Sequence, residues 1–315
     1  MDQAALETYL SGKLETPVRI KSLNRSFPGL SRETWLVFLE DGGPYPGLVV
    51  RVEAPGGGIC PTVFEDEWRV YQTLHKTNVP VAIPLWYDEG PELTQGRPLF
   101  VRVLVDGSTY LPGLHDDTKE AAARRQRVAE EHAEKLALIH TLDWKALGFG
   151  DFLSAPASVE DAALHELNNV RDMWMRTRTY PSGVIAEAFY WFEDHLPAPA
   201  PRLSLLKGNN GIGEEIWRDD KIVAFSDWEL ASIGDPTYDW ANSQGMMKLC
   251  DRELSLGCYE RATGFSIPRA SLSYYIVWEA MMSGRVLHSG LRAFLTGEDP
   301  RLARCTLGAG RAKTH

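Results

Sequence analysis

Several features that would define a function are missing from this 315-residue chain. No apolar run approaches the roughly 20 residues that a membrane span needs, so we expect no membrane partner. There is no Lys/Arg tract and the formal net charge is −10, which argues against a nucleic-acid partner, since phosphates require a basic face. The four cysteines lack CxxC spacing, as reduced thiols do. Together with an acidic, polar N-terminus that does not resemble a secretory leader, these absences predict a soluble cytoplasmic protein.

Common catalytic motifs are missing as well. The chain has no GxxxxGK[ST] phosphate loop, no GxSxG nucleophile elbow and no HExxH metal pair. His132 and His140 fall within a predicted helix, where a structural histidine is commoner than a ligand. The sequence therefore supports neither a P-loop nucleotidase nor a serine hydrolase nor a zinc protease.

The chain is long enough to bury a large core and to form two lobes. In its first hundred residues, helical spacing alternates with short apolar runs bounded by turn residues. We expect helices over 3–14 and about 62–76, and strands over 18–20, 34–39, 48–52, 82–87 and 99–105. This order predicts an antiparallel sheet with one internal helix.

Beyond residue 107 the pattern becomes helical. A long amphipathic helix is predicted over 119–141, followed by helices near 164–177 and 183–196, a short β region over 203–233, and further helices from Asp235 to about 295. The fold class is therefore α+β, with a small antiparallel β N-lobe over 1–106 and a larger helical C-lobe over 107–315. The junction between these two lobes, near 104–107, is a common place for a ligand cleft.

The candidate catalytic and metal-binding residues are concentrated in two stretches, Lys-Gly-Asn-Asn-Gly-Ile-Gly-Glu-Glu-Ile-Trp at 207–217 and Asp-Trp-Glu at 227–229. Phosphoryl transfer requires metal carboxylates, a cationic phosphate clamp and a loop covering the phosphates. Asp227 follows the apolar strand at 222–225, where a carboxylate can reach Mg²⁺, although an aspartate capping a turn is the simpler alternative. Asp235 is placed as a helix N-cap before Pro236, and Asp239 is expected to brace the loop at 207–217.

The run Asp-Trp-Glu-Leu-Ala-Ser-Ile-Gly-Asp-Pro at 227–236 resembles the aminoglycoside phosphotransferase (choline-kinase-like) family. It is most similar to the branch that includes the kinase domain fused to some acyl-CoA dehydrogenases. The resemblance implies a protein-kinase-like two-lobed fold and transfer of the γ-phosphate of ATP or GTP, with Mg²⁺, to a small-molecule hydroxyl. It also implies that the acceptor is a hydroxyacyl thioester or a drug-like alcohol.

The same resemblance assigns roles in the N-lobe. The stretch at 27–35 resembles the family's Gly-rich turn, in which the Ser31 hydroxyl suits a phosphate. Arg51 stands at the family's third-strand cation, and Glu67 matches the helix glutamate that pairs with it. The stretch at 101–107 resembles the hinge on which the base stacks, with Val103 and Leu104 as its contacts.

The catalytic loop departs from the family pattern. The family's His-Gly-Asp aligns with Lys207-Gly208-Asn209, and its metal-binding Asn aligns with Glu214. A neutral amide cannot accept the hydroxyl proton, but it can hold the hydroxyl by hydrogen bonding. Glu214 keeps an oxygen ligand, so Asp227 and Glu214 together suit Mg²⁺, and Lys207 supplies a positive charge against the transferring phosphoryl group.

Three explanations of this loop stay open. The site is a rewired but active kinase, or a nucleotide-binding pseudokinase with a regulatory or scaffolding role, or a loop for a different anionic ligand. Retention of Asp227 and the gain of Glu214 favour the active kinase. The sequence leaves the acceptor, the choice between ATP and GTP, and the oligomeric state open.

Overall fold

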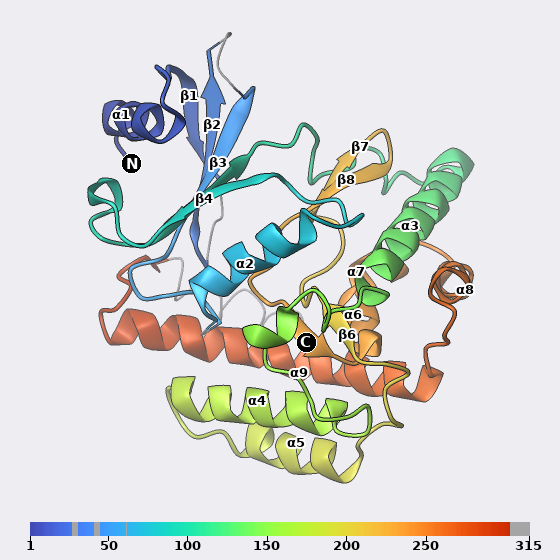
Figure 1. Ribbon diagram of the computed structural model, residues 1–315. Helices are drawn as coiled ribbons and strands as arrows, with labels where there is room; N and C mark the ends of the chain where they lie inside the picture. Colours follow the sequence, from blue (N-terminus) through green and yellow to red (C-terminus); the bar gives the residue numbers. More distant parts are fainter. Residues whose placement is uncertain (27–30, 41–44, 61, 303–315) are drawn as a thin grey trace.

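A computed structural model describes residues 1–26, 31–40, 45–60 and 62–302. Of the predicted Gly-rich turn at 27–35, residues 27–30 lie outside these ranges. The molecule is an α+β protein in which a twisted five-stranded sheet stands over a helical body, as in protein-kinase-like folds (Figure 1). Within the described ranges, no helix combines the length and apolar character needed to cross a membrane.

The five strands of the N-terminal sheet are all antiparallel. In spatial order they are β1 (Ile20–Arg25), β2 (Glu33–Leu39), β3 (Gly47–Val52), β5 (Leu99–Val103) and β4 (Pro84–Asp88). Helix α1 (Gln3–Leu14) precedes the sheet, α2 (Phe64–Leu74) joins β3 to β4, and a 3₁₀ turn, η1 (Glu92–Thr94), joins β4 to β5. The strand prediction at 18–20 was wrong in extent, because β1 continues through a polar, largely exposed edge segment that lacks an apolar pattern.

Strand alternation sorts the side chains of β3 and β5 onto two faces of the sheet. One set packs with Leu6 and Leu10 of α1 in a separate apolar core: Leu48, Val50, Val52, Leu99 and Val101. The alternate set, which includes Val49, Arg51 and Arg102, points to the opposite face, toward the rest of the molecule. An arginine on a mostly apolar strand is therefore directed to a cavity and not to solvent.

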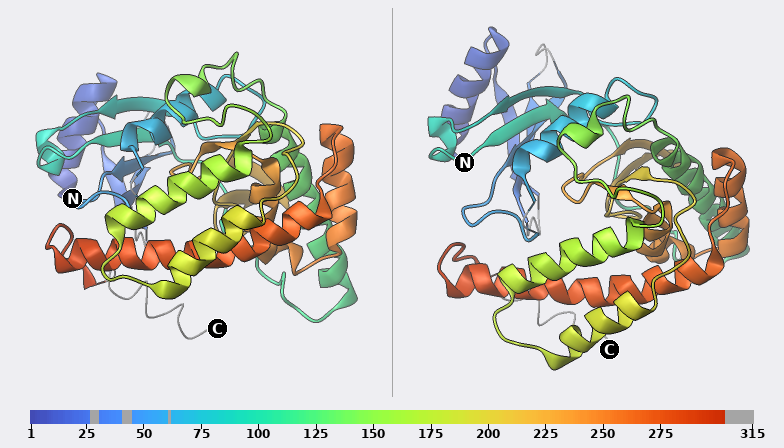
Figure 2. Two further views of the ribbon diagram at one scale, coloured as in Figure 1. Left: turned by 90° about the horizontal axis from the view of Figure 1, so that it is seen from below. Right: turned by 60° about the horizontal axis from the view of Figure 1, so that its bottom comes forward.

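The helical body carries most of the main core. Its helices are α3 (Lys119–His140), α4 (Ala162–Thr177), α5 (Gly183–Asp194), α6 (Pro236–Asn242), α7 (Gln244–Met247), α8 (Arg252–Thr263) and α9 (Arg269–Leu295), with a 3₁₀ turn, η2 (Phe149–Asp151), after α3. The long helix α9 crosses the lower part of the molecule in Figure 1, with α4 and α5 below it, and it also contacts α6 (Figures 1 and 2). The helices of this half begin and end close to the predicted positions, because their periodicity and their caps agree.

Four short strands position the loops at 207–214 and 226–231, which contain the candidate site residues of this half. Strands β6 (Ser204–Leu206) and β9 (Ser232–Gly234) pair with each other, and β7 (Glu215–Arg218) with β8 (Lys221–Phe225) forms the predicted hairpin. Its turn residues Asp219 and Asp220 have φ of 53° and 58°, the left-handed values that a tight type I′ turn needs. The loop at 207–214 thus leaves β6 and enters the hairpin, and the loop at 226–231 leaves it.

Candidate functional site

A cavity of about 790 Å³ lies between the inner face of the N-terminal sheet and the β7–β8 hairpin. Its volume is within the range of small-molecule and cofactor sites. The residues that line it include Ser31, Val49, Arg51, Arg102, Leu104, Glu214 and Asp227. The sheet, the stretch at 101–107 and the loops at 207–214 and 226–231 thus converge on one space.

Arg51 joins the two halves of this site. Its Nε lies 3.1 Å from Glu67 on α2, and its Nη2 donates to Asp227 Oδ1 at 2.6 Å. Glu67 is fully buried and Arg51 is nearly so, so the pair is held in a low-dielectric setting where its geometry is well defined. The Arg51–Glu67 pair implied by the resemblance is present, and it extends to the loop carboxylate.

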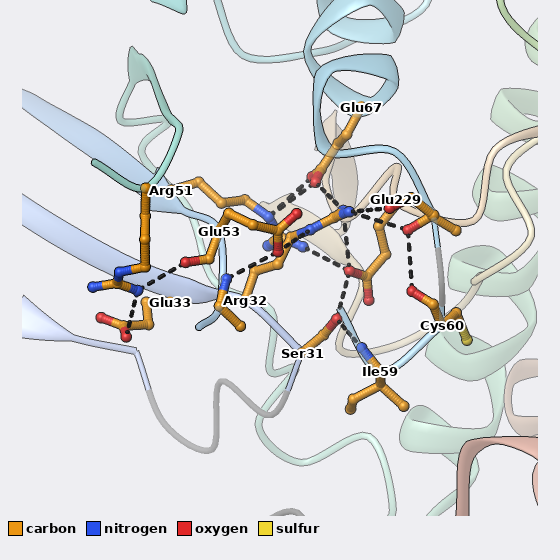
Figure 3. A network of polar contacts seen from close by, with 12 residues as sticks. Ser31, Arg32, Glu33, Arg51, Glu53, Ile59, Cys60, Glu67 and Glu229 are labelled. Atoms are coloured by element: carbon orange, nitrogen blue, oxygen red, sulfur yellow. Dashed lines mark hydrogen bonds and ion pairs between the residues drawn. The ribbon is translucent and has the colours of Figure 1, made fainter. Parts of the chain in front are cut away.

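Sequence reasoning missed a second arginine in the same network. Arg32 on the β2 side donates from Nη1 to Glu67 Oε2 at 2.9 Å and lies 3.3 Å from Glu229 Oε2 (Figure 3). Glu229 in turn accepts from the Ser31 hydroxyl at 2.8 Å, and the same hydroxyl accepts from the Ile59 amide at 3.0 Å. No pattern in the sequence singled out Arg32, because its role depends on burial and on partners far along the chain.

Asp227 occupies a strained backbone position, with φ of 59°. Its Oδ2 accepts from Asn209 Nδ2 at 2.8 Å, while its Oδ1 faces Arg51. Burial alone would raise the pKa of Asp227, but the positive charges of Arg51 and Lys207 and these two hydrogen bonds hold it below its ordinary value. The carboxylate is therefore ionised and oriented toward the cavity edge.

Glu214 behaves in the opposite way. Burial, followed by the negative charge of Asp227, raises its pKa from 4.5 to about 7. Two neighbouring carboxyl groups, of which one readily holds a proton, fit a site in which a divalent cation replaces that proton. Among the described residues there is no group of three or more His, Cys, Asp or Glu side chains suited to a metal. A hard cation here would therefore take its remaining oxygens from phosphates and water, as Mg²⁺ commonly does.

Lys207 lies beneath the loop and not in the cavity. Its side chain is fully buried, and its ammonium donates to the backbone carbonyl of Asn209 and lies 3.5 Å from that of Asp227. This location differs from the expectation that the ammonium faces the transferring phosphoryl group. The contacts make Lys207 a positioning residue that ties the two loops together.

Asp239 on α6 braces the loop at 207–214 from the other side. Its Oδ2 accepts from the Lys207 amide at 2.7 Å and its Oδ1 from the Gly208 amide at 2.8 Å, while His140 lies 3.0 Å from Oδ2. Gly208 has φ of 75°, and a Cβ there would lie 2.4 Å from the Leu230 carbonyl oxygen. Only glycine fits this close approach without displacing the loop at 226–231.

The hinge stretch at 101–107 lines the cavity, with Leu104, Val105 and Gly107 among its residues. Leu104 lines the cavity, but Val103 is not among its lining residues. Val103 pairs with Leu48 in the sheet and its amide donates to the Ile83 carbonyl at 2.9 Å. The structure thus brings Ser31, Arg51, Leu104, Glu214 and Asp227 to the cavity, with Glu67, Asn209 and Lys207 behind them.

The sequence profile of the phosphotransferase enzyme family matches residues 26–255. The chain belongs to this family.

Mouse acyl-CoA dehydrogenase family member 10 is 27% identical to this phosphotransferase-family chain over 253 residues, which are 76% of the chain and 22% of the mouse protein. The chain thus spans less than a third of the length of that relative. A putative aminoglycoside phosphotransferase from Ralstonia eutropha superposes with a TM-score of 0.68 at 19% identity, covering 98% of this chain and 94% of the other. A thermostable aminoglycoside phosphotransferase APH(4)-Ia, in ternary complex with ADP and hygromycin B, gives 0.57 at 18% identity, covering 98% and 97%.

Proposed function

We propose that this chain transfers the γ-phosphate of a purine nucleoside triphosphate to the hydroxyl of a small organic molecule. The observation that carries the proposal is the convergence of Arg51, Asp227 and Glu214 on one cavity, with Glu67 and Asn209 fixing two of them. A cation for phosphates and two carboxylates for a metal are what phosphoryl transfer needs from the protein. Membership of the phosphotransferase enzyme family supports the same reaction class.

In this proposal Asp227 and Glu214 hold Mg²⁺, which neutralises charge on the phosphates when bound. Arg51 directs its guanidinium to the same phosphates, and Glu67 keeps it extended across the cavity floor. The Ser31 hydroxyl is engaged with Glu229, so its part is to fix that carboxylate and, through it, Arg32. The phosphate end of the cavity is thereby built from side chains whose rotamers are already set.

Asn209 has separate tasks for its two polar atoms. Its Nδ2 is occupied by Asp227, and no described residue donates to its Oδ1, so this oxygen is available to accept the hydrogen bond of the acceptor hydroxyl. Because the transition state of phosphoryl transfer is loose, the hydroxyl proton leaves late and a strong base is not essential. We therefore favour an active enzyme over the nucleotide-binding pseudokinase.

A second cavity, of about 260 Å³, is the proposed acceptor site. It lies between Gly208 of the loop and the α4 residues Glu166, Asn169, Val170 and Met173. Its volume is below the roughly 300–1,000 Å³ typical of pockets for drug-sized ligands. This favours a short hydroxylated acceptor with an apolar stretch, such as a hydroxyacyl thioester entering by its acyl chain, over a drug-like alcohol.

The test combines binding with turnover. We expect Mg²⁺ with ATP or GTP to raise the melting temperature, and a panel of hydroxyacyl thioesters to release nucleoside diphosphate. Asp227→Asn should remove the thermal shift and lower kcat/KM by at least about 100-fold. Asp219→Asn is a matched control, because it also removes one carboxylate at a positive φ, but in the hairpin turn.

Two other results would speak against this function. A thermal shift without diphosphate release from any acceptor favours the pseudokinase. Neither shift nor release with either nucleotide would count against the phosphotransferase altogether.

A further inference from the structure

Arg102 on β5 is a buried cation for which no described residue supplies a hydrogen-bond acceptor to Nε or Nη1. The residue is only 6% exposed, and its Nε and Nη1 are buried without a hydrogen bond. Among the described residues, no carboxylate lies within ion-pair distance of its guanidinium, whereas Arg32 and Arg51 are each shared between acidic groups. Leaving buried N–H donors unpaired is unfavourable, so this side chain is arranged for a ligand that the protein itself does not supply.

The sheet register places Arg102 toward the hinge end of the cavity. Arg51 pairs with Phe100, and Arg102 pairs with Val49, so Arg102 lies two positions, roughly 7 Å, nearer the hinge than the partner of Arg51. Around it the cavity wall is apolar, with Val49, Leu36 and Leu104. The opposite end carries the phosphate-binding charges. A nucleotide bound with its phosphates at Arg51 therefore sets its base against Arg102.

The aromatic contact of Arg102 leaves its donors unused. Its Cζ lies 5.4 Å from the centre of the Tyr71 ring on α2, a cation–π distance. A cation–π contact takes up no N–H donor, so the buried Nε and Nη1 of Arg102 stay available to a ligand acceptor.

A guanidinium can only donate hydrogen bonds, which discriminates between purines. On the edge that carries N7, guanine presents two acceptors, O6 and N7, and arginine is its commonest bidentate partner. Adenine presents an amino group in place of O6, so a donor would face a donor. An apolar pocket wall that ends in a buried, unpaired arginine thus matches a 6-oxopurine and disfavours a 6-aminopurine.

We propose that Arg102 reads the C6 carbonyl of the nucleotide base and makes GTP, in preference to ATP, the phosphoryl donor of this enzyme. This assignment rests on the proposed phosphotransferase function and specifies its donor. Arg102 is here a specificity residue, and the phosphates stay with Arg51 and the metal carboxylates.

The experiment compares Mg²⁺ complexes of GTP, ITP and ATP by titration calorimetry. ITP keeps O6 and N7 but lacks the 2-amino group, so it isolates the contact assigned to Arg102. We expect GTP and ITP to bind at least about tenfold more tightly than ATP, the scale of one bidentate base contact. In Arg102→Met, which keeps an unbranched apolar stem, the ratio of the affinity for ITP to the affinity for ATP should fall to about one. Arg97→Met is the control in the same lobe, because Arg97 pairs with Glu33 and should leave the ratio unchanged.

The outcomes separate the two proposals. ATP binding as tightly as GTP, or a ratio unchanged in Arg102→Met, overturns the assignment of Arg102 and leaves phosphoryl transfer intact. Absence of binding by all three nucleotides overturns both. Even if Arg102→Met fails to fold, equal affinities of the unmodified protein for GTP and ATP would overturn the assignment. Arg102→Lys, with a point charge in place of the planar fork, should give an intermediate ratio of ITP affinity to ATP affinity.

Discussion

The replacement of an acid by Asn209 becomes understandable from a single contact. The Nδ2 group donates to Asp227 Oδ2 at 2.8 Å, which is one of the interactions that keep this carboxylate ionised. An aspartate at 209 could not donate and would set two carboxylates against each other. The amide is therefore suited to a site whose Asp227 is already paired with Arg51 before any nucleotide binds.

We predict that Asn209→Asp lowers the melting temperature of the metal-free protein and that Mg²⁺ restores most of the loss. Two facing carboxylates share a proton or repel each other, and a divalent cation between them removes the repulsion. Thermal melting with and without Mg²⁺ measures both effects. Asn242→Asp is the control, since it adds the same charge on α6 but keeps an oxygen that accepts from the Asn210 amide. Equal melting of Asn209→Asp and the unmodified protein without metal would contradict the role given to Nδ2.

Individual site residues could be predicted only where they belong to a recognisable sequence motif or align with one. Asp227 stood out because it follows an apolar strand, Glu214 because it aligns with the metal-binding Asn of the resembling family, and Arg51 because the resemblance gave it a partner. Arg32, just before β2, and Arg102, within β5, carry no local signal, since an arginine at either position is equally compatible with solvent. Their importance depends on strand register and burial, which arise from pairings between residues far apart in the chain.

At the scale of elements, the loop at 207–214 depends on α6. Two backbone amides of the loop donate to one carboxylate, Asp239, whose other contact is the buried His140. Burial would raise the pKa of Asp239, but the hydrogen bond and charge of His140 and the two amides hold it below its ordinary value. A short helix thereby fixes the conformation of a loop that contains no regular structure of its own.

Asp239→Asn should destabilise the protein by about 2–4 kcal/mol, because the asparagine amide places a donor against a donor in a buried site. We expect a lower midpoint in urea denaturation together with a lower kcat, since the loop loses its brace. The matched control is Asp235→Asn, which keeps the oxygen that accepts from the Thr237 amide at the helix N-cap and should change stability by less than about 1 kcal/mol. Similar effects of the two substitutions would argue that Asp239 has no special role.

Elements were more predictable than residues, for identifiable reasons. The helix predicted at 119–141 matches α3, since its apolar stripe and its length agree, and the hairpin at 216–225 was recoverable from two apolar arms around Asp219-Asp220. The strand β1 was underestimated because an exposed edge strand need not alternate. Val103 was placed at the cavity by resemblance alone, and the hydrogen bonds of its own strand turn it away.

For the molecule as a whole, the junction between sheet and helical body is made of charges and not of apolar contacts alone. Arg51 reaches Asp227 and Glu229, and Arg32 and Ser31 also reach Glu229, so four polar contacts tie the loop at 226–231 to the N-terminal lobe. Desolvated charges of this kind make overall stability depend on protonation.

We predict that the metal-free protein loses stability as pH rises from about 4.5 through 7. The pKa of Glu214 is raised to about 7, so the folded state keeps a proton that the unfolded chain has released, and folding becomes less favourable across this window. Glu214→Gln should match the unmodified protein at pH 5 and exceed it at pH 8 by about 2 kcal/mol, measured by urea denaturation. A difference that stays constant between pH 5 and pH 8 would show that Glu214 does not titrate in this range.

The bond between Ser31 and Glu229 joins residues 198 positions apart, which has a consequence for biosynthesis. At roughly 5–20 residues per second, a ribosome needs about 10–40 s to add the second partner after the first. During this time Arg32 and Arg51 have only Glu67 and Glu53 as acidic partners from the network. The nascent N-terminal sheet must therefore persist without the contacts from Asp227 and Glu229 to Arg51, Arg32 and Ser31 until residues 227–229 emerge.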